Sequence, residues 1–363
     1  MKRFFASFIL IAATAAIAAG QSNNYLKYAA GAYSGDPIAQ YNLACCLIKD
    51  NAEESDYKKA ADWLKKSAEQ GYHEAQNYLG WCYEYGKGIE QNYRLAVYWY
   101  KKSAEQGNDT AQSNLGWCYE YGKGIEENLS QAVYWYKKAA EHGNDDAQNN
   151  LGRCYALGKG IEQNYRLAVY WYKKSAEQGN GTAQYNLGWC YEYGKGIEQN
   201  YRLAVYWYKK SAEQGDDDAQ NDLGVCYEYG TGIEKDLKKA VYWYKKSAEQ
   251  GNDIAQNNLG FCYFEGIGVS MNSTKAVSWF MKSAEQENAE AQYYLGKCYS
   301  HGDGIEQSYD KGAYWYQKAA NNGHAEAQYE IGLCYYYGKG VEQDFALSEY
   351  WIEKAVANGV DIP

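Results

Sequence analysis

Apolar and polar residues alternate along the chain at helical spacing, in two stretches that return every 36 residues. In the first stretch of one copy, Ala75, Leu79 and Cys82 fall at i, i+4 and i+7, the spacing of one face of an α-helix. The second stretch, around Trp99, shows the same spacing with polar residues between the apolar ones. Each copy therefore predicts two amphipathic helices.

Two markers define the period and the number of copies. One is a tryptophan in the second stretch, at Trp63, Trp99, Trp135, Trp171, Trp207, Trp243, Trp279, Trp315 and Trp351. The other is an Ala-Gln pair in the first stretch, which starts at Ala39, Ala75, Ala111, Ala147, Ala183, Ala219, Ala255, Ala291 and Ala327. A fixed period of this length is the signature of stacked repeats that bury one another's apolar faces. We expect an all-α fold, an α-solenoid of nine helix-turn-helix repeats.

The residues at the expected helix ends agree with this interpretation. An Asp, Asn or Ser precedes each second helix, and its side-chain oxygen can cap free N–H groups. These residues are Asp56, Asn92, Asn128, Asn164, Asn200, Asp236, Asn272, Ser308 and Asp344. A glycine ends every second helix but one, where Glu287 stands. Gly80 recurs within the first helix and predicts a close approach between helices, while Gly86 and Gly88 predict a tight hairpin.

The pattern A-x-x-x-L-G-x-x-Y-x-x-G-x-G-[IV], followed by A-x-x-W-[YF]-x-K-[AS]-A-E-Q-G, resembles the Sel-one-like repeat, a relative of the tetratricopeptide repeat. In one copy the matching residues are Ala75, Leu79, Gly80, Tyr83, Gly86, Gly88, Ile89, Ala96, Trp99, Tyr100, Lys102, Ala104 and Gly107. The resemblance covers residues 35–358 and implies a right-handed superhelix of nine tetratricopeptide-like repeats. The first copy departs from it, because Asp50–Ala52 replaces the Gly-x-Gly hairpin.

The start of the chain differs from the repeats. Lys2 and Arg3 precede an uncharged apolar run, Phe4–Ala19, which predicts a signal peptide over residues 1–20 with cleavage before Gln21. The alternative is an uncleaved anchor, but the run is short for a membrane span, which needs roughly 20 apolar residues. We expect a secreted or periplasmic protein, or one in the lumen of the secretory pathway. A capping helix (21–34), the repeats (35–358) and a short tail (359–363) follow.

The net charge and the positions of the cysteines argue against a nucleic-acid partner and against disulfide bonds. The chain carries 36 Lys and Arg against 46 Asp and Glu, a net charge of −10, which argues against a nucleic-acid partner. Eight of the ten cysteines occupy one position in the repeats after the first: Cys82, Cys118, Cys154, Cys190, Cys226, Cys262, Cys298 and Cys334. Cys46 of the first repeat is in the same register. Equivalent helices lie too far apart for disulfides between them, so we expect small, reduced core residues.

We expect neither a metal site nor a cofactor nor an enzyme. No CxxC pair occurs, and His73, His142, His301 and His324 are scattered. The Ser-x-x-Lys motif of penicillin-recognising enzymes occurs at Ser55 and at Ser308, without the Ser-Asp-Asn and Lys-Thr-Gly motifs that accompany it in those enzymes. Both serines stand at the start of a second helix, where serine is a common cap. The carboxylates recur with the repeat, whereas a catalytic pair should be singular.

The candidate binding residues lie on the first helix, away from its apolar stripe. At 100° per residue, Trp81 lies about 150° from Leu79, which predicts a face opposite the second helices that lines the concave surface of a solenoid. Its occupants change along the chain. The predicted partner-binding residues are Trp81, Trp117, Arg153, Trp189, Asn77, Glu84, Tyr85, Tyr121 and Tyr193. Aromatic anchors of this kind are typical of interface hot spots.

Two alternatives stay open for this face. Each tryptophan could pack on the next first helix and be mostly covered. Asparagines recur nearby, at Asn114, Asn150, Asn186 and Asn258, and could clamp the backbone of an extended peptide or bond within the stack.

The resemblance implies scaffold or adaptor work. We therefore expect a secreted, non-enzymatic protein that binds a protein or peptide partner in the groove. The main alternative is binding of glycans or cell-wall material, since aromatic residues with Asn, Glu and Tyr also suit sugars. A hydrolase, such as the penicillin-hydrolysing cysteine-rich relatives, ranks third.

Overall fold

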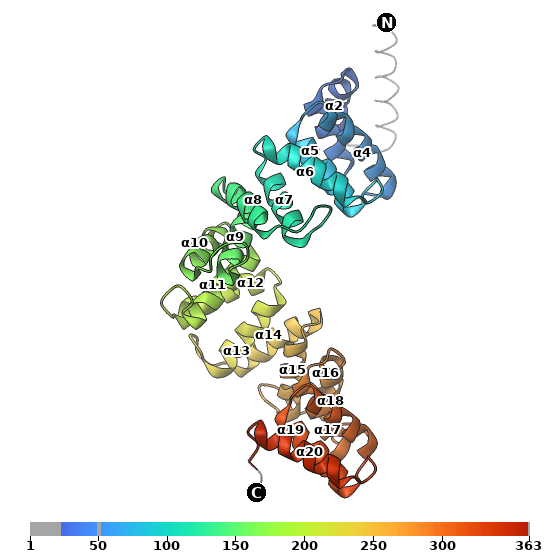
Figure 1. The fold of residues 1–363 in the computed structure, drawn as a ribbon, viewed down its shortest axis with the longest axis vertical. Helices are drawn as coiled ribbons and strands as arrows, with labels where there is room; N and C mark the ends of the chain where they lie inside the picture. Colours follow the sequence, from blue (N-terminus) through green and yellow to red (C-terminus); the bar gives the residue numbers. More distant parts are fainter. Residues whose placement is uncertain (1–22, 49–51, 362–363) are drawn as a thin grey trace. The chain divides into compact units, whose positions relative to one another are not determined.

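The computed structural model describes residues 23–48 and 52–361, and in these ranges it contains nineteen helices and no strand (Figure 1). The expected signal peptide lies outside the described residues, as does most of the segment that replaces the first Gly-x-Gly hairpin. The helices group into two compact halves, an N-terminal half up to Asn180 and a C-terminal half from Gly181 onward. The prediction of an all-α array of nine repeats is confirmed.

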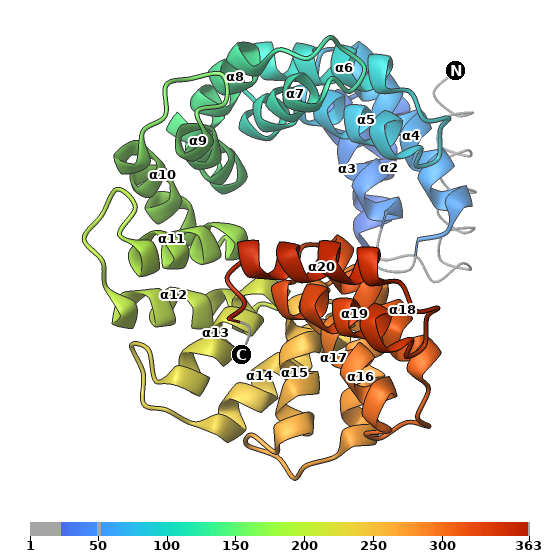
Figure 2. The same cartoon turned by 60° about the horizontal axis from the view of Figure 1, so that its bottom comes forward.

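Each repeat contributes two helices, called here its first and second helix. The N-terminal half holds α2 (Asn23–Ser34), α3 (Pro37–Leu47), α4 (Glu54–Glu69), α5 (His73–Tyr85), α6 (Tyr93–Glu105), α7 (Asp109–Tyr121), α8 (Leu129–Glu141), α9 (Asp145–Leu157) and α10 (Tyr165–Glu177). Within this half, the first helices α5, α7 and α9 lie on one side of the row and the second helices α6, α8 and α10 on the other (Figure 2).

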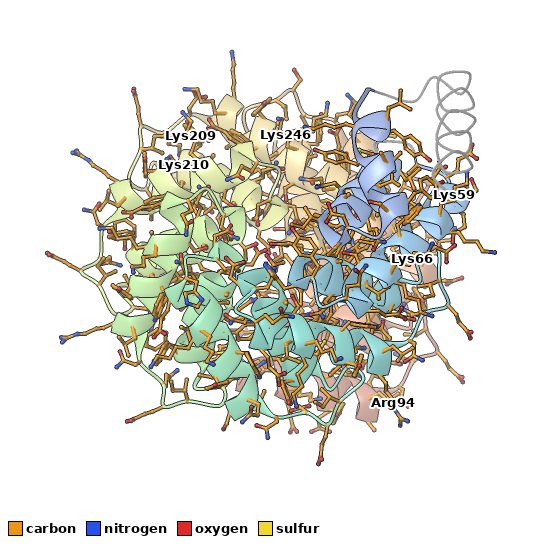
Figure 3. The ribbon with its side chains drawn as sticks, turned by 90° about the horizontal axis from the view of Figure 1, so that it is seen from above. Lys59, Lys66, Arg94, Lys209, Lys210 and Lys246 are labelled. Carbon is orange, nitrogen blue, oxygen red and sulfur yellow. The ribbon has the colours of Figure 1, made fainter. Side chains whose placement is uncertain are left out.

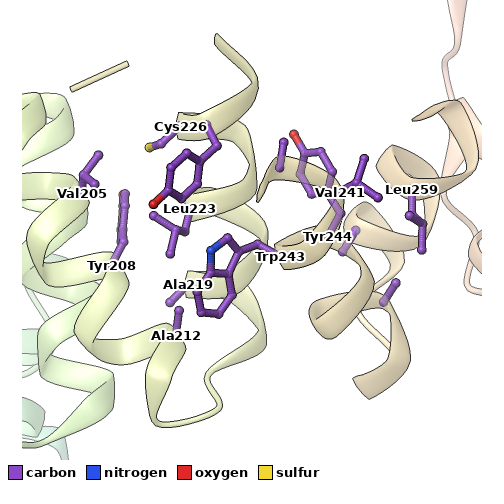
Figure 4. Close-up of a cluster of buried hydrophobic side chains, with 14 of the residues drawn as sticks. Val205, Tyr208, Ala212, Ala219, Leu223, Cys226, Val241, Trp243, Tyr244 and Leu259 are labelled. Carbon is purple, nitrogen blue, oxygen red and sulfur yellow. The ribbon is translucent and has the colours of Figure 1, made fainter. Parts of the chain in front are cut away.

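The C-terminal half continues the same order. It holds α11 (Gly181–Tyr193), α12 (Tyr201–Glu213), α13 (Asp217–Tyr229), α14 (Leu237–Gln250), α15 (Asp253–Glu265), α16 (Ser273–Glu285), α17 (Ala289–His301), α18 (Tyr309–Asn321), α19 (Ala325–Tyr337) and α20 (Phe345–Ala357). Its core runs across repeat boundaries: Tyr208 of α12, Leu223 of α13 and Trp243 of α14 belong to one buried cluster (Figure 4). No single hairpin completes a core, as expected for a quasi-one-dimensional stack.

The predicted helix ends are confirmed with one exception. The Asn92 side chain accepts from the backbone N–H of Leu95 at 3.1 Å, and the equivalent residues of the later repeats act in the same way. Glu287 takes the left-handed conformation that glycine has elsewhere, with φ 69°. The prediction of Asp56 as a cap is wrong. Helix α4 starts earlier, after Glu53, and Asp56 lies in its first turn, where its carboxylate accepts from the backbone N–H of Glu53.

The glycine within the first helix allows an aromatic ring to cross it. A Cβ at Gly80 would lie 2.6 Å from Cδ1 of Tyr100, the buried tyrosine of the second helix in the same repeat. Gly260 meets Phe280 in the same way, so the contact requires the ring and not the hydroxyl. The predicted close approach between helices is confirmed.

The second glycine of the hairpin lies against the preceding repeat. Gly88 has φ +69°, and a Cβ there would come within 2.2 Å of the backbone of Tyr57, in the first turn of α4. Gly124 stands in the same relation to the backbone of Tyr93. The Gly-x-Gly hairpin therefore shapes the turn and also allows the packing of successive repeats.

A buried glutamine joins each first helix to the second helices on both sides. Gln76 is only 3% exposed, and its Nε2 donates to the carbonyl of Ala68 in α4 at 3.1 Å. Its Oε1 accepts from Nε2 of Gln106, just after α6, at 2.7 Å. Other glutamines make both bonds, with Gln or Asn as the second partner: Gln40, Gln148, Gln220, Gln256, Gln292 and Gln328.

The third repeat lacks one of these bonds. Gln112 donates to Ala104, but its Oε1 is buried without a hydrogen-bond partner in the described part of the chain. The cause lies in the sequence, because His142 occupies the position that Gln106 holds one repeat earlier. A buried acceptor without a donor costs free energy that the other repeats do not lose.

We expect His142→Gln to raise the urea midpoint of unfolding, because the new amide can donate to Gln112. The gain should be about 1 kcal/mol, the net value of one such bond. The reverse change, Gln178→His, should remove the donor to Gln148 and cost about 1–3 kcal/mol. Circular dichroism in urea measures both. Equal effects of the same sign would show that this amide pair does not stabilise the stack.

The repeat-position cysteines are buried, except Cys334, which is half-buried; none of the ten cysteines of the described chain is in a disulfide. Burial raises the pKa of the Cys82 thiol to about 12, so the thiol stays protonated and unreactive near neutral pH.

In native protein, we expect iodoacetamide to leave Cys82 and its buried equivalents unmodified. Unfolding in iodoacetamide without reductant should then modify all eight repeat-position cysteines, which intact-mass analysis can count. Cysteines that stay blocked in pairs after unfolding would contradict this assignment.

Candidate functional site

Pairs of aromatic residues follow the exposed side of the first helices. The ring of Trp81 lies 5.4 Å from that of Tyr85, one helical turn on. The pair Trp117 and Tyr121 has the same spacing, and Trp189 and Tyr193 lie 5.2 Å apart. In each pair the tryptophan is half-buried and the tyrosine is exposed. We call the surface formed by these pairs and their equivalents the first-helix face.

The tryptophans of this face also take part in packing. Trp81 lies near Tyr57 of the preceding second helix, with ring centroids 6.4 Å apart. Trp117 packs against the buried cluster that contains Leu115 and Tyr100. The tryptophans of this face are therefore partly covered, and their interpretation as packing residues holds in part.

The expected position of Glu84 on this face is wrong. Its side chain is buried and accepts a hydrogen bond from the hydroxyl of Tyr100, on the second helix. Burial and the neighbouring carboxylate raise the pKa of Tyr100, so the hydroxyl stays a donor. The cause is the ring that crosses Gly80, because it brings the hydroxyl to the end of the first helix. Glu120, Glu192 and Glu228 make the same bond to the tyrosines of their own repeats.

The asparagines near this face form bonds within the stack. Nδ2 of Asn114 donates to Oδ1 of Asn77, in the preceding first helix, at 3.2 Å. Asn258 donates to Asn221 in the same way, at 3.0 Å. These asparagines therefore bond within the stack, where each pair of amides links neighbouring repeats. They are not free to bind the backbone of a peptide.

Arg153 replaces the tryptophan in the fourth repeat and forms an ion pair. Its Nη2 lies 2.7 Å from both carboxylate oxygens of Glu120, in the preceding first helix. The Glu120 side chain is 2% exposed and also accepts from the Tyr136 hydroxyl, so it joins α7, α8 and α9. Burial lowers the pKa of Arg153, but Glu120 and Tyr121 outweigh it and raise the pKa above its usual value. Arg153 therefore links two repeats through this ion pair and is not free to bind a partner, contrary to the prediction from the sequence.

Arg153 shows where the side chain at this position of the repeat lies. The residue that corresponds to Trp81 covers the end of the preceding first helix. Lys297 confirms this geometry, because its Nζ lies 5.7 Å from the ring centroid of Phe264. We call this the covering position. Its occupants in later repeats include two short aliphatic residues, Val225 and Leu333.

A cavity of about 360 Å³ opens in the C-terminal half where both the covering residue and the covered residue are small. Leu333 stands at the covering position, and Ser300 replaces the glutamate beneath it. Glu330, His301 and Lys339 also line the cavity. The residues of this cavity were not among the binding residues predicted from the sequence. The signal that could have found it is Glu330, an acidic residue at a position of the repeat where most other repeats carry Asn or Tyr.

The serine of the second Ser-x-x-Lys motif has a structural role. Ser308 caps α18, since its Oγ accepts from the backbone N–H of Lys311. In the described ranges, no three His, Cys, Asp or Glu residues come together as a metal site would require. No helix found there is both long and apolar enough to span a membrane.

Comparisons with known proteins agree with this architecture. Nine consecutive segments match the family model of the Sel1 repeat: residues 37–72, 73–108, 110–144, 145–180, 181–216, 217–252, 253–288, 289–324 and 325–360. A protective antigen present in uropathogenic Escherichia coli strains, with an SLR fold, is 33% identical; the match covers 93% of this chain and 88% of that one, with a TM-score of 0.58.

A second solved structure, a Sel1 repeat protein from Oxalobacter formigenes, is 32% identical. That match covers 83% of this chain and 87% of the other, with a TM-score of 0.60. The search of curated proteins found no match.

We expect Trp81→Ala and Trp99→Ala to differ in their effect on stability. Trp99 is buried among core residues of the preceding helices, so its truncation should cost about 3–5 kcal/mol. Trp81 is half-exposed and should cost clearly less. Thermal unfolding followed by circular dichroism measures both. Equal losses would show that the tryptophans of the first-helix face serve packing alone.

Proposed function

The chain belongs to the Sel1 repeat family, and we propose that it is a non-enzymatic scaffold or adaptor that binds a protein or peptide partner on its first-helix face. The observation that carries the proposal is the contrast between two sets of positions. The buried glutamine and the hairpin glycine that join successive repeats recur, the glutamine in all nine repeats and the glycine in eight. The covering position between them varies among Trp, Arg, Val, Phe, Lys and Leu.

This variation supports recognition because it is confined to a surface. A side chain that only packs can be the same in every repeat, as Leu79 and its equivalents nearly are. A partner of definite sequence needs different contacts along its length. Exposed tyrosines and half-exposed tryptophans are the residue types that most often dominate binding energy at interfaces.

The shape of the aromatic pairs favours a peptide over a glycan. The rings of Trp81 and Tyr85 are inclined at 39°, and the other two pairs at 43° and 41°. Inclined rings form a notch that can hold a side chain on both flanks, whereas a sugar ring stacks best on one open aromatic plane. A glycan partner is therefore the second choice.

We propose a location outside the cytoplasm, in a secreted or periplasmic form or in the lumen of the secretory pathway. The proposal rests on the charged start and apolar run of residues 1–20, typical of a secretory signal. The description of the Escherichia coli relative as a protective antigen agrees with it.

Affinity capture with the chain from residue 21 onward, against envelope and secreted proteins of the source organism, should yield a binding partner. Truncating the exposed tyrosines Tyr85, Tyr121 and Tyr193 to alanine together should then weaken binding of the purified partner at least tenfold, because a single hot spot is worth about 2 kcal/mol. Calorimetry measures the affinity.

The matched control is the triple alanine variant of Tyr98, Tyr134 and Tyr206. These tyrosines are similarly exposed but lie on the second helices. Affinity should hardly change in this variant. Equal losses in the two triple variants, or a loss in the control alone, would remove the first-helix face as the binding surface.

A further inference from the structure

Two carboxylates stand on the first-helix face at one position of the repeat: Asp222 on α13 and Glu330 on α19. The other repeats that have a Gly-x-Gly hairpin carry Tyr or Asn at this position: Tyr78, Asn114, Asn150, Asn186, Asn258 and Tyr294. Three residues further on is the covering position. The two acidic repeats are those that carry a short aliphatic residue there, Val225 and Leu333. The acidic residue and the missing cover therefore occur together.

The fourth repeat shows which group fits beneath a covering position. There the guanidinium of Arg153 lies on the carboxylate of Glu120 at 2.7 Å. Glu192 and Val225 occupy the same two positions two repeats later. Valine has no cationic group and is too short to occupy that space, so Glu192 lacks the counter-ion that Glu120 has from Arg153.

Asp222 adds a second carboxylate beside Glu192. Burial raises the pKa of Asp222 to about 6, and the charges of Glu192 and Asp218 add to this, against hydrogen bonds from Asn221 and Tyr185. Glu192 and Asp218, the charged neighbours that shift the pKa of Asp222, are both acidic. Two neighbouring carboxylates disfavour each other's charged form, and a cation bound between them would relieve this repulsion.

At the other acidic repeat, which carries Glu330, the structure contains an open cavity. Glu330 lines the cavity of about 360 Å³ beneath Leu333. It forms no hydrogen bond or ion pair with any residue that the structure describes. Burial raises the pKa of Glu330, while His301 and Lys297 oppose this effect. Lys339 and the rings of Tyr309 and Tyr337 line the same cavity.

We propose that these two positions are subsites for arginine or lysine side chains of the peptide partner. The inference rests on the proposed function and names the chemistry of what the first-helix face binds. In the first subsite, an incoming guanidinium lies between Glu192 and Asp222, where Arg153 lies on Glu120 in the fourth repeat. In the second, a basic side chain enters the cavity and pairs with Glu330. A net charge of −10 also favours a basic partner.

The test uses a fluorescein-labelled peptide of repeated Gly-Ser-Arg units, with fluorescence anisotropy as the readout. Asp222→Asn and Glu330→Gln keep the side-chain shape and remove the charge. Each should weaken binding about tenfold, which corresponds to about 1.4 kcal/mol. A Gly-Ser-Glu peptide should not bind.

The matched controls are Glu213→Gln and Glu249→Gln, which remove the same charge from the outside of α12 and α14. There these glutamates pair with exposed lysines, Lys209 and Lys245. Figure 3 labels Lys209, the partner of Glu213, with its neighbour Lys210. If the controls weaken binding as much as Asp222→Asn does, the peptide senses net charge alone and the inference fails.

Val225→Arg gives a second, independent test. The guanidinium of the new arginine should pair with Glu192, as that of Arg153 pairs with Glu120, and so fill the subsite. Peptide binding should fall about tenfold, as for Asp222→Asn, and the melting temperature should not fall. Unchanged peptide affinity in a folded Val225→Arg protein would overturn the subsite.

Two further outcomes would overturn the inference. One is no binding of the arginine peptide to the wild-type chain. The other is competition by millimolar Ca²⁺ or Mg²⁺ at constant ionic strength, which would indicate a metal site. If the captured partner binds Asp222→Asn and Glu330→Gln as tightly as wild type, the subsites are wrong but the proposed function stands. The proposed function itself is tested by the tyrosine variants. It fails if truncating Tyr85, Tyr121 and Tyr193 weakens partner binding no more than truncating Tyr98, Tyr134 and Tyr206 does.

Discussion

The buried glutamine of each first helix determines how one repeat lies on the next. Gln76 spans from a carbonyl of the preceding second helix to an amide that follows its own second helix. A buried amide costs free energy unless its donors and acceptor are satisfied, so both neighbours must be placed to bond it. The glycines at 80 and 88 allow the backbones to come close enough for these bonds, because a Cβ at either position would collide with the adjacent helix. Packing and polar bonding thus select the same arrangement in repeat after repeat.

Because buried glutamines and glycines fix the stacking of the repeats, the residues of the first-helix face can vary. The covering position carries an indole, a guanidinium, an amine or a short aliphatic chain without a change in the helices beneath it. What lies at the end of the preceding first helix varies with it: Glu120 beneath Arg153, Phe264 beneath Lys297 and Ser300 beneath Leu333. Each pair defines a local chemistry: a closed ion pair, a cation–π contact or an open cavity. A row of such pairs can distinguish one extended partner from another through contacts spaced along its length.

Most of the fold follows from the sequence, because the same local signals recur in nearly every repeat. The helix caps, the left-handed ends and the glycine crossed by a ring are each local or depend on one neighbouring helix. The candidate site was less predictable. A helical projection placed Glu84 on the first-helix face, but its side chain accepts a hydrogen bond from the hydroxyl of Tyr100. A projection of one helix cannot reveal such a tertiary contact. Asp222 and Glu330 were missed because they are the two acidic residues at a position that otherwise carries Asn or Tyr. Their significance depends on the covering residue three positions further on.

The structure of the complex with the captured partner tests the central claim most directly. We expect a partner segment that runs across the first helices and contacts Trp81 or Trp189 with their tyrosines. A basic side chain of this segment should lie against Asp222 or Glu330. A partner bound only to the outer side of the second helices, around Tyr98 and its equivalents, would contradict it.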